Sequence, residues 1–358
     1  MNPLFEKLTF SRGPDMKNRF MLAPLTNTQS RDDGTMSDDE YRCLTMRAVG
    51  GFGLTMTCAA HVQANGQGFP GQLGIFDDKH LAGLSKLATT IKSEGSIAIA
   101  QLHHAGMRSP NELIGETAVC PSDNEEFDAR AMSEDEVEAL ISSFIEAALR
   151  AEKAGFHGIE IHGAHGYILG QFLSAEVNLR QDRYGGTLEN RSKPINDIIT
   201  GIRKLCENDF MIGLRLSPER FGMQLSEIIH YSQQLMSEGN IDFLDMSLWD
   251  VYKEPIEDAY KGRSLISYFT ELDRGNVRLG VAGKIRTGAH ALKTLGEGVD
   301  WVMLGRAAII HHDFPNQLLE NPNFEPTSLP VSREYLAKEG LGPSFIDYMG
   351  AWRNFVAD

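Results

Sequence analysis

The chain has 358 residues, with 34 Lys and Arg against 49 Asp and Glu, which gives a formal charge of −15. This balance argues against nucleic acid and anionic membranes as partners, because both would repel the protein. Hydrophobic residues make up 42% and charged residues 23%, the usual composition of a globular protein, and the apolar runs are far shorter than the ~20 residues that span a bilayer.

The cysteines and the first residues of the chain bear on its location. Cys43, Cys58, Cys120 and Cys206 lie far apart and form no C-x-x-C pair, so there is no zinc-ribbon or iron–sulfur ligand run. Charged side chains occupy the first residues, where a signal peptide needs an apolar core. We therefore expect a cytoplasmic protein.

Short, mostly apolar runs alternate with longer amphipathic stretches along the chain. The short runs predict strands buried on both faces, at residues 20–25, 54–59, 97–102, 158–162, 211–216, 243–247, 277–282 and 301–304. Helical spacing between them predicts helices at 80–93, 191–206, 227–237 and 288–295. Ser37 and Ser133 each precede a Glu by three positions, which predicts a capping box, and the helix after Ser133 is expected to end at Gly155.

Strands that alternate with helices indicate an α/β fold with a parallel sheet, and eight strands is the number that closes a (β/α)8 TIM barrel. The alternative, an open doubly wound sheet, favours a Gly-rich turn after its first strand, whereas residues 24–27 are Pro-Leu-Thr-Asn. We predict a single barrel domain over residues 1–358. Its core is expected at roughly 18–311, with loop insertions at 106–132 and 249–262 and a C-terminal extension at 312–358.

The residues that follow each strand are the candidates for chemistry, because barrels place their active sites at the carboxyl ends of the strands. Gly283 and Lys284 follow the seventh strand, and Gly305 and Arg306 follow the eighth. Barrels commonly hold a phosphate there, on backbone N–H groups that glycine leaves accessible. The alternative is that these glycines form ordinary turns and that both cations face solvent.

Arg215 is unusual because it lies inside an otherwise apolar strand. A buried guanidinium needs an anionic or strongly accepting partner, since leaving it unpaired costs several kcal/mol. Either a ligand supplies that partner, or a barrel carboxylate such as Glu160 or Asp245 forms an ion pair with it.

His162 and His165 follow the fourth strand, with Tyr167 two residues further on. The two histidines could be metal ligands, hydrogen-bond donors to a substrate, or structural residues. A metal site would take further ligands from His103, His104 or Asp245. Neutral imidazoles beside a phenol are better suited to protonating a substrate carbon, because Tyr remains a proton source at neutral pH.

A series of segments, in order along nearly the whole chain, resembles the old yellow enzyme family of FMN-dependent ene-reductases. The segments are 17–26 (KNRFMLAPLT), 70–75 (PGQLGI), 101–106 (QLHHAG), 160–167 (EIHGAHGY), 172–174 (FLS) and 178–191 (NLRQDRYGGTLENR). Each segment is weak evidence by itself, and together they are strong.

This resemblance implies that FMN lies at the barrel mouth. The residues that would line one side of its isoalloxazine are Ala23, Pro24, Leu25 and Thr26, with Ala60 nearby. Gln101 and Arg215 would bond its pyrimidine end, where the Arg215 cation would stabilise the reduced, anionic flavin. His162 is also expected to contact the cofactor. The phosphate would be surrounded by Gly283, Lys284, Gly305 and Arg306.

The resemblance also implies an FMN-dependent NAD(P)H oxidoreductase that reduces activated C=C bonds of α,β-unsaturated carbonyl or nitro compounds. In such a ping-pong reaction NADH or NADPH gives a hydride to flavin N5, which passes it to the β-carbon. His162 and His165 would bind the substrate oxygen, and Tyr167 would protonate the α-carbon. The expected partners are thus an activated alkene and a nicotinamide cosubstrate, and a homo-oligomer is left open.

Some features depart from the family or leave alternatives. Thr26 stands where one branch carries Cys, and no cysteine follows Cys206, so the iron–sulfur motif and extra domains of longer relatives are not expected. Trp352 and Arg353 either reach a neighbouring subunit's site or dock on their own chain. The alternative functions are an FMN-dependent NADH oxidase or amine or alcohol dehydrogenase, a metal-dependent hydrolase barrel, and a non-catalytic flavin-binding protein.

Overall fold

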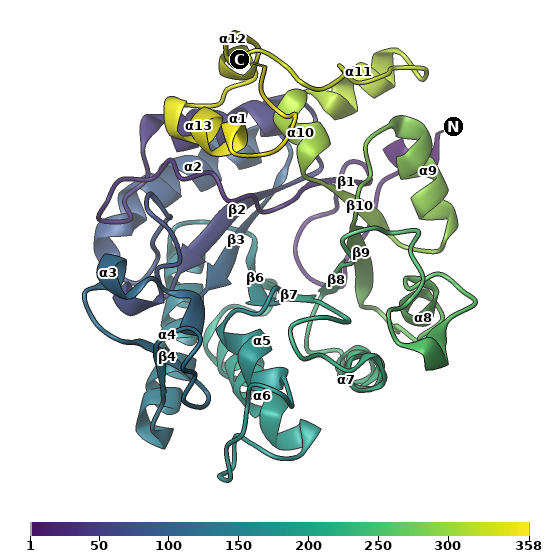
Figure 1. The fold of residues 1–358 in the computed structure, drawn as a ribbon. Helices are drawn as coiled ribbons and strands as arrows, with labels where there is room; N and C mark the ends of the chain where they lie inside the picture. The colour runs from purple at the N-terminus through teal and green to yellow at the C-terminus, as the bar shows by residue number, and fades with distance from the viewer. Residues whose placement is uncertain (1, 358) are drawn as a thin grey trace.

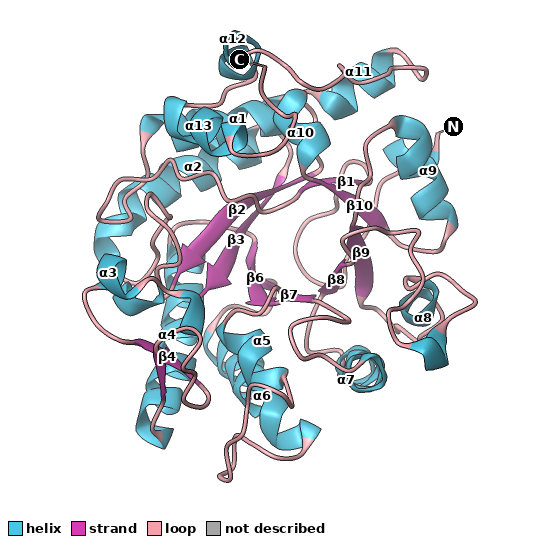
Figure 2. Ribbon diagram, in the orientation of Figure 1, coloured by secondary structure: helices cyan, strands magenta, loops and turns pink. Residues whose placement is uncertain are grey.

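The computed structural model describes residues 2–357, and within them eight parallel strands close into a barrel surrounded by helices (Figures 1 and 2). The strands of this barrel are β1 (Phe20–Leu22), β2 (Leu54–His61), β3 (Ile97–His103), β6 (Gly158–Gly163), β7 (Met211–Leu216), β8 (Phe243–Ser247), β9 (Arg278–Ala282) and β10 (Trp301–Leu304). The predicted (β/α)8 barrel is confirmed. Among the strands, the predicted and observed bounds differ most at β1. It was predicted to end at residue 25 but ends at Leu22, because Pro24 has no N–H to continue the ladder.

The barrel closes where β1 pairs with β10, with Phe20 opposite Val302 and Leu22 opposite Leu304. Its lower interior is apolar, formed by alternate residues of the strands such as Met21, Phe243 and Trp301, against which the N-terminal segment also packs. The active-site end therefore stands above a filled core, as in other barrels of this size.

Helices follow the strands and cover the outside of the barrel. They are α1 (Asp38–Val49), α2 (Leu81–Ser93), α4 (Glu134–Lys153), α6 (Leu188–Leu205), α7 (Leu225–Glu238), α9 (Gly288–Gly296) and α10 (Arg306–Ile310). Shorter helices are α3 (Asn111–Ile114), α5 (Ile168–Leu173), α8 (Ser267–Thr270), α11 (Phe314–Glu320), α12 (Arg333–Lys338) and α13 (Pro343–Gly350). None of the helices in residues 2–357 combines the length and apolar character that crossing a bilayer requires.

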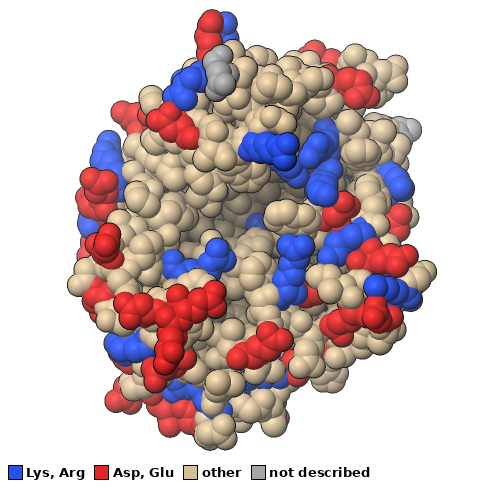
Figure 3. Space-filling model, in the orientation of Figure 1, with Lys and Arg blue, Asp and Glu red and all other residues tan. Residues whose placement is uncertain are grey.

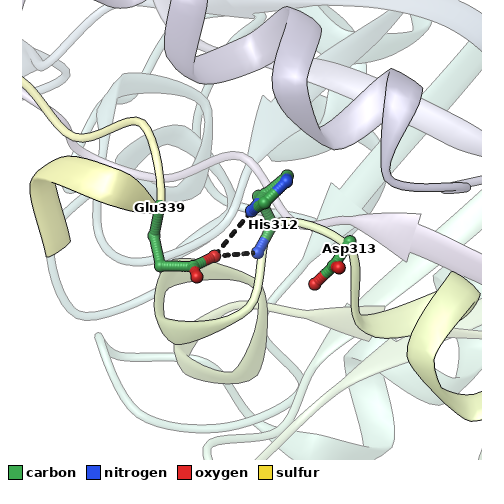
Figure 4. A group of neighbouring side chains, drawn as sticks. All are labelled: His312, Asp313 and Glu339. Carbon is green, nitrogen blue, oxygen red and sulfur yellow. Dashed lines mark hydrogen bonds and ion pairs between the residues drawn. The ribbon is translucent and has the colours of Figure 1, made fainter. Parts of the chain in front are cut away.

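The insertion at 106–132 contains a separate two-stranded sheet of β4 (Ala118–Cys120) and β5 (Ala129–Ala131). The C-terminal extension packs α12 and α13 against α1 and α10, which places the end of the chain beside the barrel mouth (Figure 1). One carboxylate oxygen of Glu339 accepts from the backbone N–H of His312 at 2.8 Å and lies 2.6 Å from its ring Nδ1 (Figure 4). This contact fixes the turn after α12 to the turn after α10.

One predicted capping box forms completely and the other only in part. Ser133 and Glu136 exchange both hydrogen bonds at the start of α4, as predicted. Ser37 caps α1 through the backbone N–H of Glu40, but the Glu40 side chain turns inward, where Asn27, Ser30 and Cys58 hydrogen-bond it. Burial raises the pKa of Glu40, so this side chain anchors the loop after β1 as a buried carboxyl group rather than as a surface cap.

The capping box at Ser133 can be tested directly. Ser133→Ala removes the acceptor for the Glu136 N–H, and we expect it to lower the free energy of unfolding by about 1 kcal/mol. Urea denaturation measures the change. Ser142→Ala, at an exposed position inside the same helix, is the control and should be neutral or slightly stabilising, because Ala is the better helix former. A Ser133→Ala variant as stable as the control would contradict the assignment.

Candidate active site

A cavity of about 270 Å³ opens at the carboxyl ends of β1, β7, β9 and β10. Figure 3 shows a hollow on this face of the molecule, with Lys and Arg side chains gathered near it. Most of the predicted cofactor residues line the cavity: Ala23, Pro24, Leu25, Thr26, Arg215, Gly283, Lys284, Gly305 and Arg306. Other parts of its wall come from residues that the sequence did not single out: Ala282, Ile285, Arg286, Met303, Ile309, Tyr348 and Met349. Trp352, which the sequence did single out, also lines it.

Trp352 thus lies at the mouth of its own chain, where it packs edge-to-face against Tyr348 of α13.

One end of this cavity carries two cations without counterions. Within residues 2–357, neither Arg286 nor Arg306 forms an ion pair or a side-chain hydrogen bond. Burial, assisted by the charge of Arg286, lowers the pKa of Arg306. Lys284 also lines the cavity as predicted, but its ammonium lies 3.2 Å from the Asp250 carboxylate. An anion at this end would therefore meet Arg286 and Arg306 as its uncompensated charges.

Arg215 supplies a second unsatisfied group to the same cavity. The side chain is buried, and its Nε has no partner in the described part of the chain, while Nη2 lies 3.4 Å from the Ser247 hydroxyl. The ion pair with Glu160 or Asp245 that the sequence left open is not formed in residues 2–357, although Asp245 lies opposite Arg215 on β8. A buried N–H without an acceptor is costly, so this position suits a ligand that brings an acceptor.

Three predicted cofactor residues, Ala60, Gln101 and His162, are buried and are not part of the cavity wall. Gln101 donates from Nε2 to the Glu160 carboxylate at 2.6 Å, so its amide is oriented from inside the barrel. Burial and the adjacent Glu160 raise the pKa of Asp245 well above its usual range. Two neighbouring carboxyl groups therefore lie in the barrel interior, and the raised pKa of Asp245 opposes its ionisation beside Glu160.

A second cavity, of about 390 Å³, lies at the ends of β6, β7 and β8 and contains His165 and Tyr167. Tyr348 lines both cavities. Ser247 also links them, because its hydroxyl is within hydrogen-bond distance of Arg215 in the first cavity and of His165 in the second. The predicted cofactor residues and the predicted catalytic residues therefore meet at one place.

The hydrogen bonds around the two histidines assign their protons. The Ala164 N–H donates to His162 Nδ1 at 3.3 Å, so a neutral His162 carries its proton on Nε2, which lies 3.2 Å from His165 Nδ1. His165 then carries its proton on Nε2 and donates it to Ser247 Oγ at 2.7 Å. Burial, with the nearby charge of Arg215 acting in the same direction, holds the pKa of each histidine well below 6.5. Both side chains are therefore neutral N–H donors.

The turn that carries these groups has an uncommon backbone. His165 has φ +60° and Gly166 has φ +68°, and the His165 N–H donates to Ser217 Oγ at 3.0 Å. A non-glycine residue in the left-handed region costs energy and is found mainly at functional sites. Here this conformation turns the chain from β6 into α5, with Tyr167 at the start of the helix.

Tyr167 is held between neighbours while its hydroxyl stays free of any bond to residues 2–357. The His103 ring packs against it edge-on at 4.4 Å between centroids, and the Arg108 guanidinium lies 4.9 Å from its centroid. Burial raises the pKa of Tyr167, a direction that Arg108 opposes and Tyr348 supports. The phenol therefore keeps its proton at neutral pH.

The histidines proposed as a metal set are neighbours, with 5.3 Å between the ring centroids of His103 and His162, but no three of their ligand atoms converge in residues 2–357. His103 Nδ1 is bonded to Gln72 at 3.0 Å, and His104 accepts from the Gly106 N–H at 3.0 Å. Within residues 2–357, three candidate ligand atoms lie close together only at His312, Asp313 and Glu339 of the C-terminal extension (Figure 4). The metal-dependent hydrolase alternative therefore lacks its ligand geometry.

Comparison with known proteins agrees with this geometry. The model of the NADH:flavin oxidoreductase / NADH oxidase family matches residues 3–324. The chain belongs to this family. It is 36% identical to a probable NADH-dependent flavin oxidoreductase, YqiG of Bacillus subtilis, over 86% of this chain and 85% of that protein. It is 32% identical to an NADPH dehydrogenase of a Geobacillus species, over 98% of both chains.

Among solved structures, an old yellow enzyme homologue from Zymomonas mobilis superposes with a TM-score of 0.80. The two are 26% identical, and the match covers 96% of this chain and 99% of that one. The chain is an FMN-dependent NAD(P)H oxidoreductase of the old yellow enzyme type. Its first cavity fits FMN, since it offers two uncompensated cations for a phosphate and an unpartnered buried N–H of Arg215 for a flavin acceptor.

Loss of either uncompensated cation should weaken FMN binding through its phosphate. We expect Arg286→Gln and Arg306→Gln each to raise the FMN Kd by about 10- to 100-fold, the size of a charge-assisted hydrogen bond. Quenching of flavin fluorescence on titration of apoprotein measures the Kd. Riboflavin, which lacks the phosphate, is the control, and its Kd should not change. Equal weakening of both ligands would place the phosphate elsewhere.

The pKa directions of the two histidines and Tyr167 predict that the rate of flavin reoxidation by an enone does not change with pH near neutrality. Both histidines have pKa values lowered below 6.5 and are neutral above that pH, while Tyr167 has a pKa raised above 10 and stays protonated below it. The rate of flavin reoxidation by an enone should therefore stay constant between pH 6 and 8 in stopped-flow measurements. An inflection near pH 6.5 that disappears in His165→Asn would show that this histidine titrates in the working range.

Proposed function

We propose that this protein uses NADH or NADPH to reduce activated C=C bonds of α,β-unsaturated carbonyl or nitro compounds. The observation that carries the proposal is a set of three neutral proton-bearing groups next to a cavity that fits FMN. His165 and Tyr167 line the second cavity, and His162 is buried behind them with its Nε2 3.2 Å from His165 Nδ1. FMN, when bound, supplies reversible two-electron hydride chemistry. Arg215, Arg286 and Arg306 would hold it, beside the wall formed by residues 23–26.

The two histidines would bind the substrate oxygen. Each offers one N–H, now directed at His165 Nδ1 and at Ser247 Oγ, and a carbonyl or nitro oxygen can replace these internal acceptors. When the β-carbon accepts a hydride, negative charge moves to that oxygen, and preplaced donors stabilise it. A single donor of this kind typically contributes about 2.7–4 kcal/mol, or 10²–10³ in rate.

Tyr167 would complete the reduction by giving its proton to the α-carbon. Its hydroxyl has no competing acceptor among the described residues, and it keeps its proton at neutral pH because burial raises its pKa. The overall reaction then takes a hydride from NAD(P)H and a proton from Tyr167, which solvent restores. A positioned general acid typically contributes 10²–10⁴ in rate.

An NADH oxidase or an amine or alcohol dehydrogenase would share the cofactor and the fold. We favour alkene reduction because the unbonded phenol stands beside two oxygen-binding donors, an arrangement that protonation of a carbon requires and that electron transfer to oxygen does not.

Stopped-flow kinetics tests this proposal through Tyr167→Phe. The reduced wild-type enzyme should be reoxidised faster by cyclohexenone than by air. The variant should lose 10²–10⁴ of the rate with cyclohexenone and keep its rate of reduction by NAD(P)H, since only the alkene needs the proton. If both half-reactions slow equally, or if air outcompetes cyclohexenone in the wild type, the protein is not an enone reductase that works through Tyr167.

A further inference from the structure

The second cavity has an excess of positive charge that neither the cofactor nor the proposed reduction explains. Its charged lining residues are Arg108, Arg220 and Lys253 against one carboxylate, Glu219. Lys253 and Glu219 form an ion pair, and the other Glu219 oxygen accepts from the Ile256 N–H at 2.8 Å. Arg108 and Arg220 have no carboxylate partner within residues 2–357. Both side chains are exposed, so water solvates them in the free protein and their charges are available to an anion that enters the cavity.

Arg108 is the cation nearest to the reacting groups. Its guanidinium lies 4.9 Å from the centroid of the Tyr167 ring, and Nη1 donates to the His165 carbonyl oxygen at 2.6 Å. That bond uses one of five N–H donors, which leaves a fork suited to bidentate binding of a carboxylate. The two histidines are neutral, so each can donate an N–H to an oxygen but adds no positive charge to attract a carboxylate.

The outer wall combines apolar surface with the second cation. Phe221 and Trp249 line the cavity and are 42% and 67% exposed, and the Arg220 guanidinium lies 5.2 Å from the Trp249 ring centroid. Arg220, Phe221 and Trp249 have φ values of +67°, +54° and +64°. Strained backbone at three non-glycine residues around one cavity is typical of a binding site.

We infer that the second cavity selects activated alkenes that carry a carboxylate in addition to the carbonyl that activates the double bond, and that Arg108 binds this carboxylate. This inference rests on the proposed function, because it assigns the substrate class of the same site. The activating carbonyl occupies the two histidines, the carboxylate meets Arg108 a few bonds away, and Arg220 adds attraction at the rim.

NAD(P)H is the other anion that would bind beside the second cavity, but a ribose separates its phosphates from the nicotinamide ring. Arg108 lies at the Tyr167 ring itself, so it is placed for an anionic group close to the reacting carbons. The two assignments differ in which half-reaction depends on Arg108.

The test uses 4-oxo-2-pentenoate, whose ketone activates the alkene, and its uncharged methyl ester. The quantity measured is the ratio of kcat/KM for the acid to that for the ester, with NADPH and NADH in separate series. We expect Arg108→Gln to lower this ratio by about 10- to 100-fold, the size of a charge-assisted hydrogen bond, whatever the intrinsic reactivity of each compound. Arg220→Gln should lower the ratio less.

Arg183→Gln is the matched control. Arg183 pairs with Glu134 and Glu138 outside both cavities, so its loss changes the net charge equally and should leave the ratio unchanged. An unchanged acid-to-ester ratio in Arg108→Gln would overturn the inference. A rise in KM for NAD(P)H with an unchanged ratio would also overturn it, and would assign Arg108 to the cosubstrate.

A binding measurement keeps the test independent of turnover. The saturated analogues 4-oxopentanoate and its methyl ester are titrated into the FMN-loaded, oxidised enzyme, and the Kd is read from the flavin absorption change. The wild type should bind the acid at least tenfold more tightly than the ester, and Arg108→Gln should lose this preference. If neither alkene reoxidises the flavin, the proposed function fails while this preference still decides the role of Arg108. A wild type without the preference would contradict the inference.

Discussion

The site depends on the pairing of β1 with β10, because this contact closes the barrel. It brings residues 23–26, at one end of the sequence, beside the loops that carry Arg286 and Arg306, near the other end. An open sheet with the same strands would leave these segments on opposite edges. The apolar lower interior holds this closure, since inward side chains of the strands, including Trp301 and Phe243, fill it. The mouth can therefore collect polar groups that would otherwise destabilise a core.

Some of those polar groups have partners within the protein, and others have none. Inside the barrel, Glu160 accepts from Gln101, burial raises the pKa of Asp245, and neither carboxyl group forms an ion pair with Arg215 in residues 2–357. At the phosphate end two guanidinium groups stand near each other without carboxylates in residues 2–357. Repulsion and desolvation here cost free energy that a bound anionic cofactor offsets, because ligand binding stabilises the folded state. The protein is thus expected to be less stable without FMN than with it.

The sequence predicted those parts of the molecule that local pattern determines. The eight strands follow from apolar runs, and the Ser133 cap follows from a four-residue motif. Most of the predicted cofactor residues reach the first cavity because they directly follow strands. It did not predict Arg286 or Tyr348, because a loop and the C-terminal extension place them there, and no short spacing in the sequence indicates such contacts. Likewise, Glu40 matches a surface capping motif but is buried by Asn27, Ser30 and Cys58, a tertiary effect.

The central claim is that the first cavity is the FMN site and that Arg215 supplies its unpartnered N–H to the cofactor. A crystal structure of the FMN-loaded protein tests this most directly. We predict the phosphate between Arg286 and Arg306, the pyrimidine ring within hydrogen-bond distance of Arg215 Nε, and the exposed flavin face towards His165 and Tyr167. A flavin bound elsewhere, or an Arg215 side chain paired with Asp245 beneath it, would contradict the claim.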